Sequence, residues 1–371
     1  MKKHLLSTSA IALGVAAAAP ASAQEWNLDW GGFMSQHVAW VDASGTALPA
    51  GSDYDGVDTH NNSEIIFSPS ITLDNGLTFG VNIQMEGNNN GGGATGIDES
   101  YMTISGDTLG RIEIGNENSA GYKSMVAAPG VTSMYINSPS ISTFMPNTAA
   151  GLGFGFRGAM ASAYTEVGRN NDVNRISYYT PDFNGLTLGI SYASRGNVNA
   201  GNTFSVNKNA VLSDIFDIGA YYSQTFGTTS VTIGARYGTG DTPVAGFSDP
   251  EIWAIGAQVG FADFTVGGHF AQDDNGAPNG AGDQESWSFG ATYDAPGAWS
   301  FEALYFHGEN DNGLPAAGTN DYDAYRIGAS RDLGPGVDWD IYAIQAEIDT
   351  PGVAGTDVEA TIIGTAINLS F

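Results

Sequence analysis

The sequence contains no cysteine. This excludes disulfide bridges, thiolate metal sites and thiol nucleophiles, so the fold must be held by backbone hydrogen bonds and packing. Positive charge is scarce, with 12 Lys and Arg against 40 Asp and Glu and a net charge of -28. A chain this acidic lacks the basic surface that nucleic acid requires, and we expect no nucleic-acid partner.

Long apolar runs are also missing. The longest lies at the N-terminus, where Lys2 and Lys3 precede an apolar stretch over residues 5–20 and the small residues Ala21-Ser22-Ala23. It is shorter than the roughly 20 residues that a spanning helix needs. The pattern predicts a cleaved signal peptide over residues 1–23 and a mature chain over residues 24–371. Its removal leaves ten basic side chains against the 40 acidic ones.

What the sequence does contain is glycine, aromatic residues and a regular alternation. There are 51 Gly, 18 Phe, 16 Tyr and 7 Trp. Apolar and polar residues alternate over stretches typical of strands. In the clearest pair, residues 64–73 and 77–86 flank Asp74-Asn75-Gly76, a tight hairpin turn. The aromatic content and the alternation argue against disorder.

The alternation predicts sixteen strands in a single domain. They are expected near residues 28–41, 62–73, 77–87, 98–105, 109–116, 173–181, 185–195, 213–225, 229–238, 250–260, 263–272, 285–294, 298–308, 322–331, 336–347 and 358–371. Short turns and long polar connections follow each other in strict alternation, which places all long connections at one rim. The fold class is therefore all-β: a 16-stranded antiparallel transmembrane β-barrel.

Closure follows from the apolar face of these strands. Hydrocarbon offers no hydrogen-bond partner to a free strand edge, so a spanning sheet must join its last strand to its first. About sixteen strands leave an interior too wide for side chains to fill, which predicts an aqueous channel. We expect its wall to consist of Gly, Ser, Thr, Asn and isolated charges. A soluble sandwich or solenoid would not order its connections so regularly, and no repeat of fixed length occurs.

The segments 64–86, 110–115 and 174–192, together with the terminal Phe371, give the chain its resemblance to a general porin of the Gram-negative outer membrane, of the alphaproteobacterial type. The resemblance implies localisation in the outer membrane and passive diffusion of ions and small hydrophilic solutes. It also implies a homotrimer in contact with membrane lipids and lipopolysaccharide. Finally, it implies a third loop folded into the barrel, where basic wall residues face acidic loop residues.

The third long connection, residues 116–172, is the longest in the chain. A connection of this length without structure of its own needs a role, which favours folding into the lumen. Its carboxylates before Asp172 are Glu117 and Glu166, and residues 125–156 carry no charge. We therefore expect a polar or apolar constriction rather than a strongly acidic one.

Charged residues on the strands point into the lumen by parity. The candidate pore-lining and constriction residues are Arg111, Arg175, Arg236, Arg326 and Glu113 on strands, with Arg157 and Glu166 in the third connection. One interpretation is an arginine patch opposing carboxylates, which orients dipolar solutes by a transverse field. The other is that any charge on a spanning strand must face water, because a lipid-facing Arg costs about 2–4 kcal/mol at the midplane.

The long connections carry acidic clusters, for example Asp53, Asp55 and Asp58. Their oxygens suit weak Ca²⁺ binding, but no loop has a calcium-loop spacing, which favours solvated charge at the rim. We expect no cofactor and a weak preference for cations. A channel selective for a sugar, phosphate or peptide is the alternative. A barrel hydrolase using His269 or His307 is a weaker one, and we expect a protein that is not an enzyme.

Overall fold

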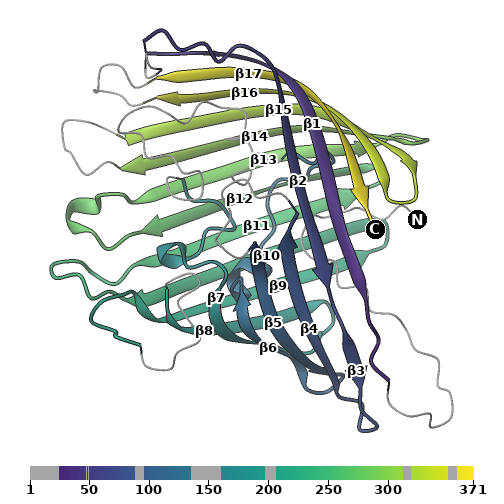
Figure 1. Ribbon diagram of the computed structural model, residues 1–371, viewed down its shortest axis with the longest axis vertical. Helices are drawn as coiled ribbons and strands as arrows, with labels where there is room; N and C mark the ends of the chain where they lie inside the picture. Colours follow the sequence, from purple (N-terminus) through teal and green to yellow (C-terminus); the bar gives the residue numbers. More distant parts are fainter. Residues whose placement is uncertain are drawn as a thin grey trace.

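The computed structural model describes residues 25–46, 48, 50–87, 96–134, 160–196, 206–311, 319–349 and 357–371. The expected signal peptide and Arg157 lie outside these residues. Within them the chain forms one β-sheet that closes into a barrel (Figure 1). None of the helices in these ranges is long and apolar enough to cross a membrane.

The strands follow one another around the barrel in chain order. They are β1 (Trp30–Ser44), β2 (Gly56–Phe67), β3 (Ser70–Thr72), β4 (Thr78–Glu86), β5 (Ile97–Gly106), β6 (Gly110–Glu117), β7 (Val173–Tyr179), β8 (Leu186–Arg195), β9 (Ser213–Phe226), β10 (Thr229–Asp241), β11 (Glu251–Phe261), β12 (Phe264–Asp274), β13 (Gln284–Asp294), β14 (Trp299–Asp311), β15 (Thr319–Gly334), β16 (Val337–Asp349) and β17 (Val358–Ser370). The short helix α1 (Ala120–Lys123) and two 3₁₀ turns, Val167–Arg169 and Pro278–Gly280, complete the described elements.

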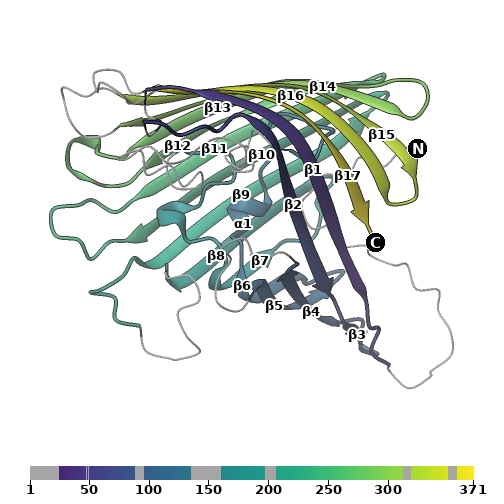
Figure 2. The same cartoon turned by 45° about the horizontal axis from the view of Figure 1, so that its top comes forward.

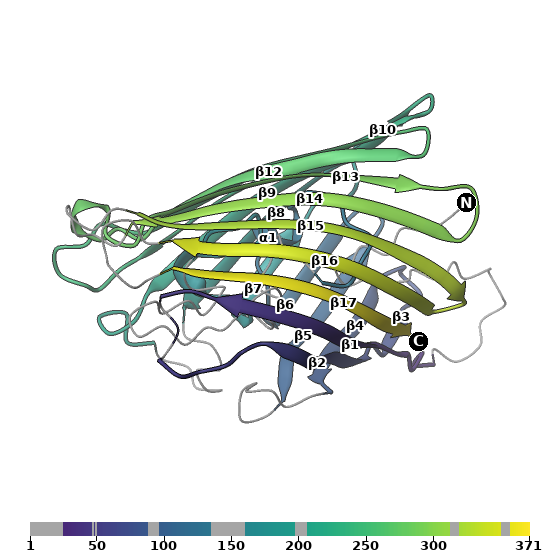
Figure 3. The same cartoon turned by 90° about the horizontal axis from the view of Figure 1, so that it is seen from above.

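The barrel closes through β1, which pairs antiparallel with β2 on one side and with β17 on the other. The β1–β17 ladder extends from Phe33 opposite Ser370 to Ser44 opposite Glu359. Figure 3 shows the purple β1 lying beside the yellow β17. Because the first and last strands pair along this length, the sheet leaves no open edge for hydrocarbon to meet.

The predicted fold, a 16-stranded antiparallel barrel, is confirmed, although the sheet contains seventeen strand segments. Segments β2 and β3 both pair with β4, so they are two parts of one barrel strand. The interruption falls at Pro69, which has no backbone N–H to donate to a ladder. Its carbonyl oxygen still accepts a hydrogen bond of 2.9 Å from the Val81 amide.

The strand bounds differ from prediction mainly at the rim of the long connections. β2 begins at Gly56 and β15 at Thr319, whereas alternation of apolar residues indicated starts near 62 and 322. The added start of β2 still pairs with β1, as in Val57 opposite Trp40. Apart from Val57, the residues added at these ends are glycine or polar, so the strand continues where the hydrophobic pattern that predicted it has stopped.

The outer face of the barrel is apolar and exposed. On β7, Ile176 and Tyr178 point outward. The residues that alternate with them, Arg175, Ser177 and Tyr179, are buried on the inner side. Phe289, Ile327 and Ile363 are among the large apolar side chains exposed on this outer face. A soluble protein would not expose so continuous an apolar surface, whereas hydrocarbon solvates it.

The inner face departs from the expected wall of small polar residues and isolated charges. Across β1 and β14–β17 it carries a buried apolar cluster that includes Phe306, Tyr322, Tyr342, Ile344 and Ile362. Met134 and Met160, from the connection between β6 and β7, belong to the same cluster. Parity identified the inward side of each strand, but it does not reveal whether water or more protein lies against that side.

The apolar outer face predicts that the cost of a charged substitution depends on its depth in the membrane. Ile327, in the middle of β15, and Phe226, at the end of β9, are both exposed on the outer face. Ile327→Arg is expected to lower the free energy of unfolding from lipid vesicles by about 2–4 kcal/mol, and Phe226→Arg by about 1 kcal/mol or less. Guanidinium titration in vesicles measures both. Equal losses at the two depths would contradict a membrane-facing outer surface.

Candidate functional site on the inner wall

The connection between β6 and β7 is described over residues 118–134 and 160–172. Its contacts are with inward-facing groups of the wall, and Figure 2 shows α1 enclosed by the strands. From α1 onward the chain crosses the wall toward β16. Its successive wall partners are Ser191 on β8, Ser288 on β13, Glu302 on β14 and Asp340 on β16.

Glu166 joins the outgoing and returning parts of this connection. Its Oε1 accepts a 2.5 Å hydrogen bond from the backbone N–H of Ser119, the N-cap residue of α1. The Ser119 side chain in turn accepts from the Tyr122 amide at 3.1 Å. Tyr122 and Tyr164, one from each part, lie with ring centroids 5.4 Å apart. The two ends of the connection are therefore fastened to each other as well as to the wall.

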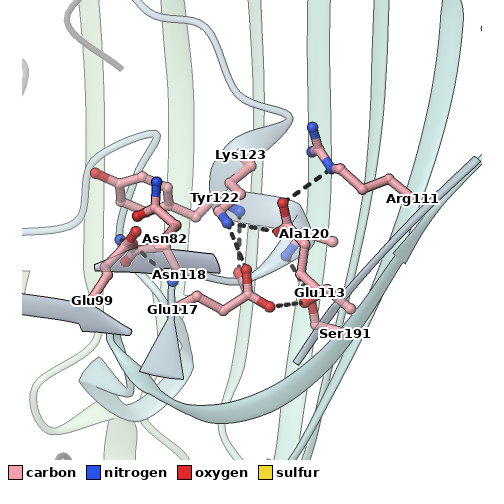
Figure 4. Close-up of polar contacts among 12 residues, drawn as sticks. Asn82, Glu99, Arg111, Glu113, Glu117, Asn118, Ala120, Tyr122, Lys123 and Ser191 are labelled. Carbon is pink, nitrogen blue, oxygen red and sulfur yellow. Dashed lines mark hydrogen bonds and ion pairs between the residues drawn. The ribbon is translucent and has the colours of Figure 1, made fainter. Parts of the chain in front are cut away.

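Lys123 ends α1 and lies over two carboxylates of β6 (Figure 4). Its Nζ lies 2.8 Å from Glu113 Oε2 and 2.6 Å from Glu117 Oε2. Arg111 Nε lies 3.0 Å from Glu113 Oε1. Two cations thus meet two carboxylates, which leaves this group close to neutral.

Aromatic rings complete the surroundings of these two cations. Lys123 Nζ lies 4.5 Å from the ring centroid of Tyr101, and the Arg111 guanidinium lies 4.4 Å from that of Tyr179. Burial alone would lower the pKa of Lys123, but the acidic groups Tyr179, Glu117 and Glu113 outweigh it and hold that pKa well above its usual value. Lys123 therefore stays charged across the physiological range.

A second carboxylate group lies beside the first, on β2, β4 and β5. Glu99 accepts a hydrogen bond from Asn118 Nδ2 at 2.6 Å (Figure 4). It also accepts one from Gln84 Nε2 at 2.7 Å, and both partners are neutral amides. Glu64 and Glu86 are cross-strand neighbours next to it. Strands β2, β4 and β5 themselves contain no Lys or Arg. This side of the wall consequently carries more carboxyl groups than basic groups.

Two of the predicted arginines, Arg175 and Arg236, form buried ion pairs beside the connection. Arg175 Nη2 donates to the Asn170 carbonyl at 2.7 Å and lies 3.6 Å from Glu166 Oε2. Arg236 pairs with Asp217 of the neighbouring strand, directly beneath Gly121 of α1. All of these charges are buried, so each depends on its partner for the solvation that water would otherwise supply.

The far end of the described segment is held in the same way. Glu302 Oε2 accepts from the Val131 amide at 2.6 Å and Glu302 Oε1 accepts from the Thr132 hydroxyl at 2.7 Å. Arg326 Nε lies 2.9 Å from the same Oε1. On β16, Asp340 Oδ2 accepts from the amide of Ser133 at 2.7 Å and from its hydroxyl at 2.9 Å. Carboxylates of the wall thus bind backbone amides of the connection.

The structure separates the candidate residues into two groups. Arg111 is about a third exposed and adjoins Glu113. Arg175, Arg236 and Arg326 are only 3 %, 4 % and 1 % exposed, which differs from an arginine patch facing open water across the channel. Glu166 is buried with Arg175. Sequence reasoning gave no role to Glu99, to Lys123, which lies on a connection without periodicity, or to Asp340, whose partner Ser133 is 207 positions earlier.

A serine–histidine pair also went unrecognised in the sequence. His269 on β12 faces Ser288 on β13, with Nδ1 2.5 Å from the serine Oγ. The other ring nitrogen, Nε2, lies 3.2 Å from Ser286 Oγ, and both His269 and Ser288 are buried. The Ser288 hydroxyl also accepts from the Ala128 amide at 3.3 Å. Among the described residues, no group of three or more His, Asp or Glu is arranged to hold a metal ion.

Comparison with known proteins adds a family and several related folds. Residues 7–351 match the family model described as Gram-negative porin. The anion-selective porin from Comamonas acidovorans aligns with 94% of this chain and 100% of its own at 20% identity and a TM-score of 0.60. OmpT, an outer membrane protein of Vibrio cholerae in its trimer form, aligns with 93% and 99% at 11% identity and a TM-score of 0.62.

A mutant of the Rh. blastica porin aligns with 93% of this chain and 100% of its own at 20% identity and a TM-score of 0.56. At these identities the structural matches show a shared fold. No curated protein matches the chain.

The Glu302 contacts predict that the far end of the segment depends on one carboxylate. Glu302→Gln leaves Arg326 buried beside a neutral amide, which is expected to cost about 3–5 kcal/mol of unfolding free energy. Proteolysis within residues 118–134 should also increase. Replacing both residues, as Glu302→Gln with Arg326→Met, should recover part of the loss because no uncompensated charge remains. Wild-type stability in Glu302→Gln would show that this pair does not hold the segment.

Proposed function

Because the chain belongs to the Gram-negative porin family and forms a channel in the outer membrane, we propose that ions and small hydrophilic solutes diffuse through it passively, with a weak preference for cations. The observation that carries the preference is the excess of carboxylates on the wall of β2–β6. Glu113 and Glu117 are balanced by Lys123 and Arg111. The neighbouring strands β2, β4 and β5 add the carboxyl groups of Glu64, Glu86 and Glu99 and contain no Lys or Arg.

A surplus of carboxylates acts on passing ions through the local potential. A cation about 4 Å from a carboxylate in water gains about 1 kcal/mol, and an anion loses as much. The apolar cluster on β1 and β14–β17 covers the inner side of those strands, whereas on the acidic side Glu64 is partly exposed and Glu86 is exposed. The overall charge of -28 raises the cation concentration at the channel mouth in the same sense.

Anion selectivity is a property named for the Comamonas porin, which is 20% identical to this chain. Charge on the channel wall is set by individual side chains rather than by the barrel, so the preference proposed here rests on this chain's own residues. The mature domain in this proposal begins after residue 23, and residues 116–172 form its constriction. Ions and solutes pass without chemical change, since His269 and Ser288 are sealed beneath the connection.

The acidic wall predicts how selectivity responds to neutralisation. Glu64→Gln with Glu86→Gln should lower the cation-to-anion permeability ratio roughly twofold to fivefold, as expected for losing about 0.5–1 kcal/mol of local potential. Reversal potentials across a salt gradient in planar bilayers measure the ratio. The matched control, Glu347→Gln with Glu359→Gln, removes the same charge from outward-facing neighbours on β16 and β17. A wild-type preference for anions would contradict the proposal.

We further propose that three copies associate through the outer face of β1 and β2. Gln36 on β1 and Thr59, Asn61 and Ser63 on β2 point outward among apolar strands, and Gln36 lies directly opposite Asn61. Polar side chains at this depth are unfavourable in hydrocarbon but acceptable against another protomer. The trimer form named for the Vibrio relative supports the same assembly.

The absence of cysteine makes this interface testable by labelling. Asn61→Cys should be shielded from a lipid-soluble maleimide in the native assembly and become reactive after heat dissociation. Ile327→Cys, exposed on the outer face of β15, should react in both states. Equal labelling of the two native variants would place β2 in contact with lipid and overturn the interface.

A further inference from the structure

A row of glycines lies on the inner wall beneath the segment that starts at α1. The inward-facing residue under the segment is glycine on five strands: Gly189 on β8, Gly219 on β9, Gly234 on β10, Gly256 on β11 and Gly290 on β13. We call these five residues the glycine track. Gly189 is the cross-strand partner of Gly219, and Gly234 that of Gly256, so the track continues across adjacent strands.

The space above these glycines is filled by the segment itself. A Cβ on Gly234 would lie 3.0 Å from Met125 Cα and from the Val126 nitrogen, and it would overlap the Ser124 carbonyl oxygen. A Cβ on Gly256 would overlap the Val126 carbonyl oxygen and lie 2.9 Å from its carbon. Real Cβ atoms do not approach backbone this closely. The segment therefore lies against the wall at a distance that only glycine permits.

Backbone conformation gives no competing reason for these glycines. None of the five has a positive φ. Glycine inside a strand costs roughly 0.5–1 kcal/mol relative to alanine, so five of them weaken the wall unless close approach requires them. Elsewhere on the same inner faces the strands carry larger residues, such as Arg236 on β10 and Ala254 and Gln258 on β11.

We propose that the glycine track sets the clearance of the channel, by letting residues 120–128 lie flat against the wall instead of projecting toward the axis. The inference rests on the channel function and adds which residues fix its size limit. Lys123 holds the segment near its start, and Glu302 holds it beyond the track. A methyl group added to the wall between these two contacts displaces the backbone of the segment toward the channel axis. This follows because close-packed atoms transmit a displacement rather than absorb it.

The alanine substitutions differ in how closely the added Cβ approaches the segment, so their effects on conductance should differ in size. Gly234→Ala and Gly256→Ala place Cβ against backbone atoms, whereas in Gly290→Ala the nearest segment atom is Ala128 Cβ at 3.2 Å. Single-channel conductance should fall clearly in the first two and little in the third. Liposome swelling should show that entry of larger neutral sugars is lost before entry of smaller ones. The cation-to-anion ratio should stay near that of wild type, since no charge changes.

The matched control is Gly80→Ala on β4. Gly80 is buried on the inner face and has no positive φ, and its Cβ would meet the Thr103 hydroxyl, which can rotate away, rather than the segment. Its conductance should equal wild type. Heat-modifiable gel migration checks that each variant folds, and Gly290→Ala keeps the series informative if a stronger clash prevents assembly.

The possible outcomes separate this proposal from the channel function. Unchanged or raised conductance in folded Gly234→Ala and Gly256→Ala would overturn the role of the track while leaving a working channel. A fall in Gly80→Ala equal to theirs would also overturn it, since the effect would then belong to any inner-wall glycine. No conductance from the wild-type protein would instead defeat the proposed function itself.

Discussion

A backbone amide in hydrocarbon has no water to bond, and the architecture follows from that constraint. Each strand must find partners on both sides, so the sheet closes through β1 and β17. Closure forces alternate side chains outward, where Ile363 and Phe289 meet lipid, and inward, where Arg175 and Glu302 do not. The break at Pro69 is tolerated because β2 and β3 both keep β4 as a neighbour. Everything that concerns transport takes place on the inner side.

The inner wall serves two purposes on different parts of the ring. Across β8–β16 it is a binding surface for the chain's own connection, with glycines for close approach and carboxylates that accept backbone amides. On β2–β6 it carries carboxylates in excess of bases. The buried arginines of the wall mainly neutralise buried partners, as Arg236 does for Asp217. Charged residues that look equivalent in the sequence therefore have two roles. Some form buried ion pairs, and others act on the electrostatic potential in the channel.

The sequence was sufficient to predict the strands, their order and their faces, because alternation is a local property that lipid enforces on every strand. The contacts of the candidate site could not be predicted in the same way. Parity placed Arg326 and Glu302 inward, but their partners Val131 and Thr132 are about 170 positions earlier than Glu302. Lys123 drew no attention because it lies on a connection without periodicity. The inward residues of β14–β17 belong to an apolar cluster with Met134, which no pattern on those strands could indicate.

The path of residues 120–132 also bears on how the molecule is assembled. This segment is synthesised before β8–β16, the strands on which it comes to rest, so nearly all its contacts are non-local. Such contacts form slowly, because distant parts of the chain must first be brought together. Seating of the segment must therefore wait until β8–β16 have formed, which makes it a late event in assembly. Before that event, the chain has an unbound segment and two open sheet edges. This is the state in which it most needs a chaperone on its way to the membrane.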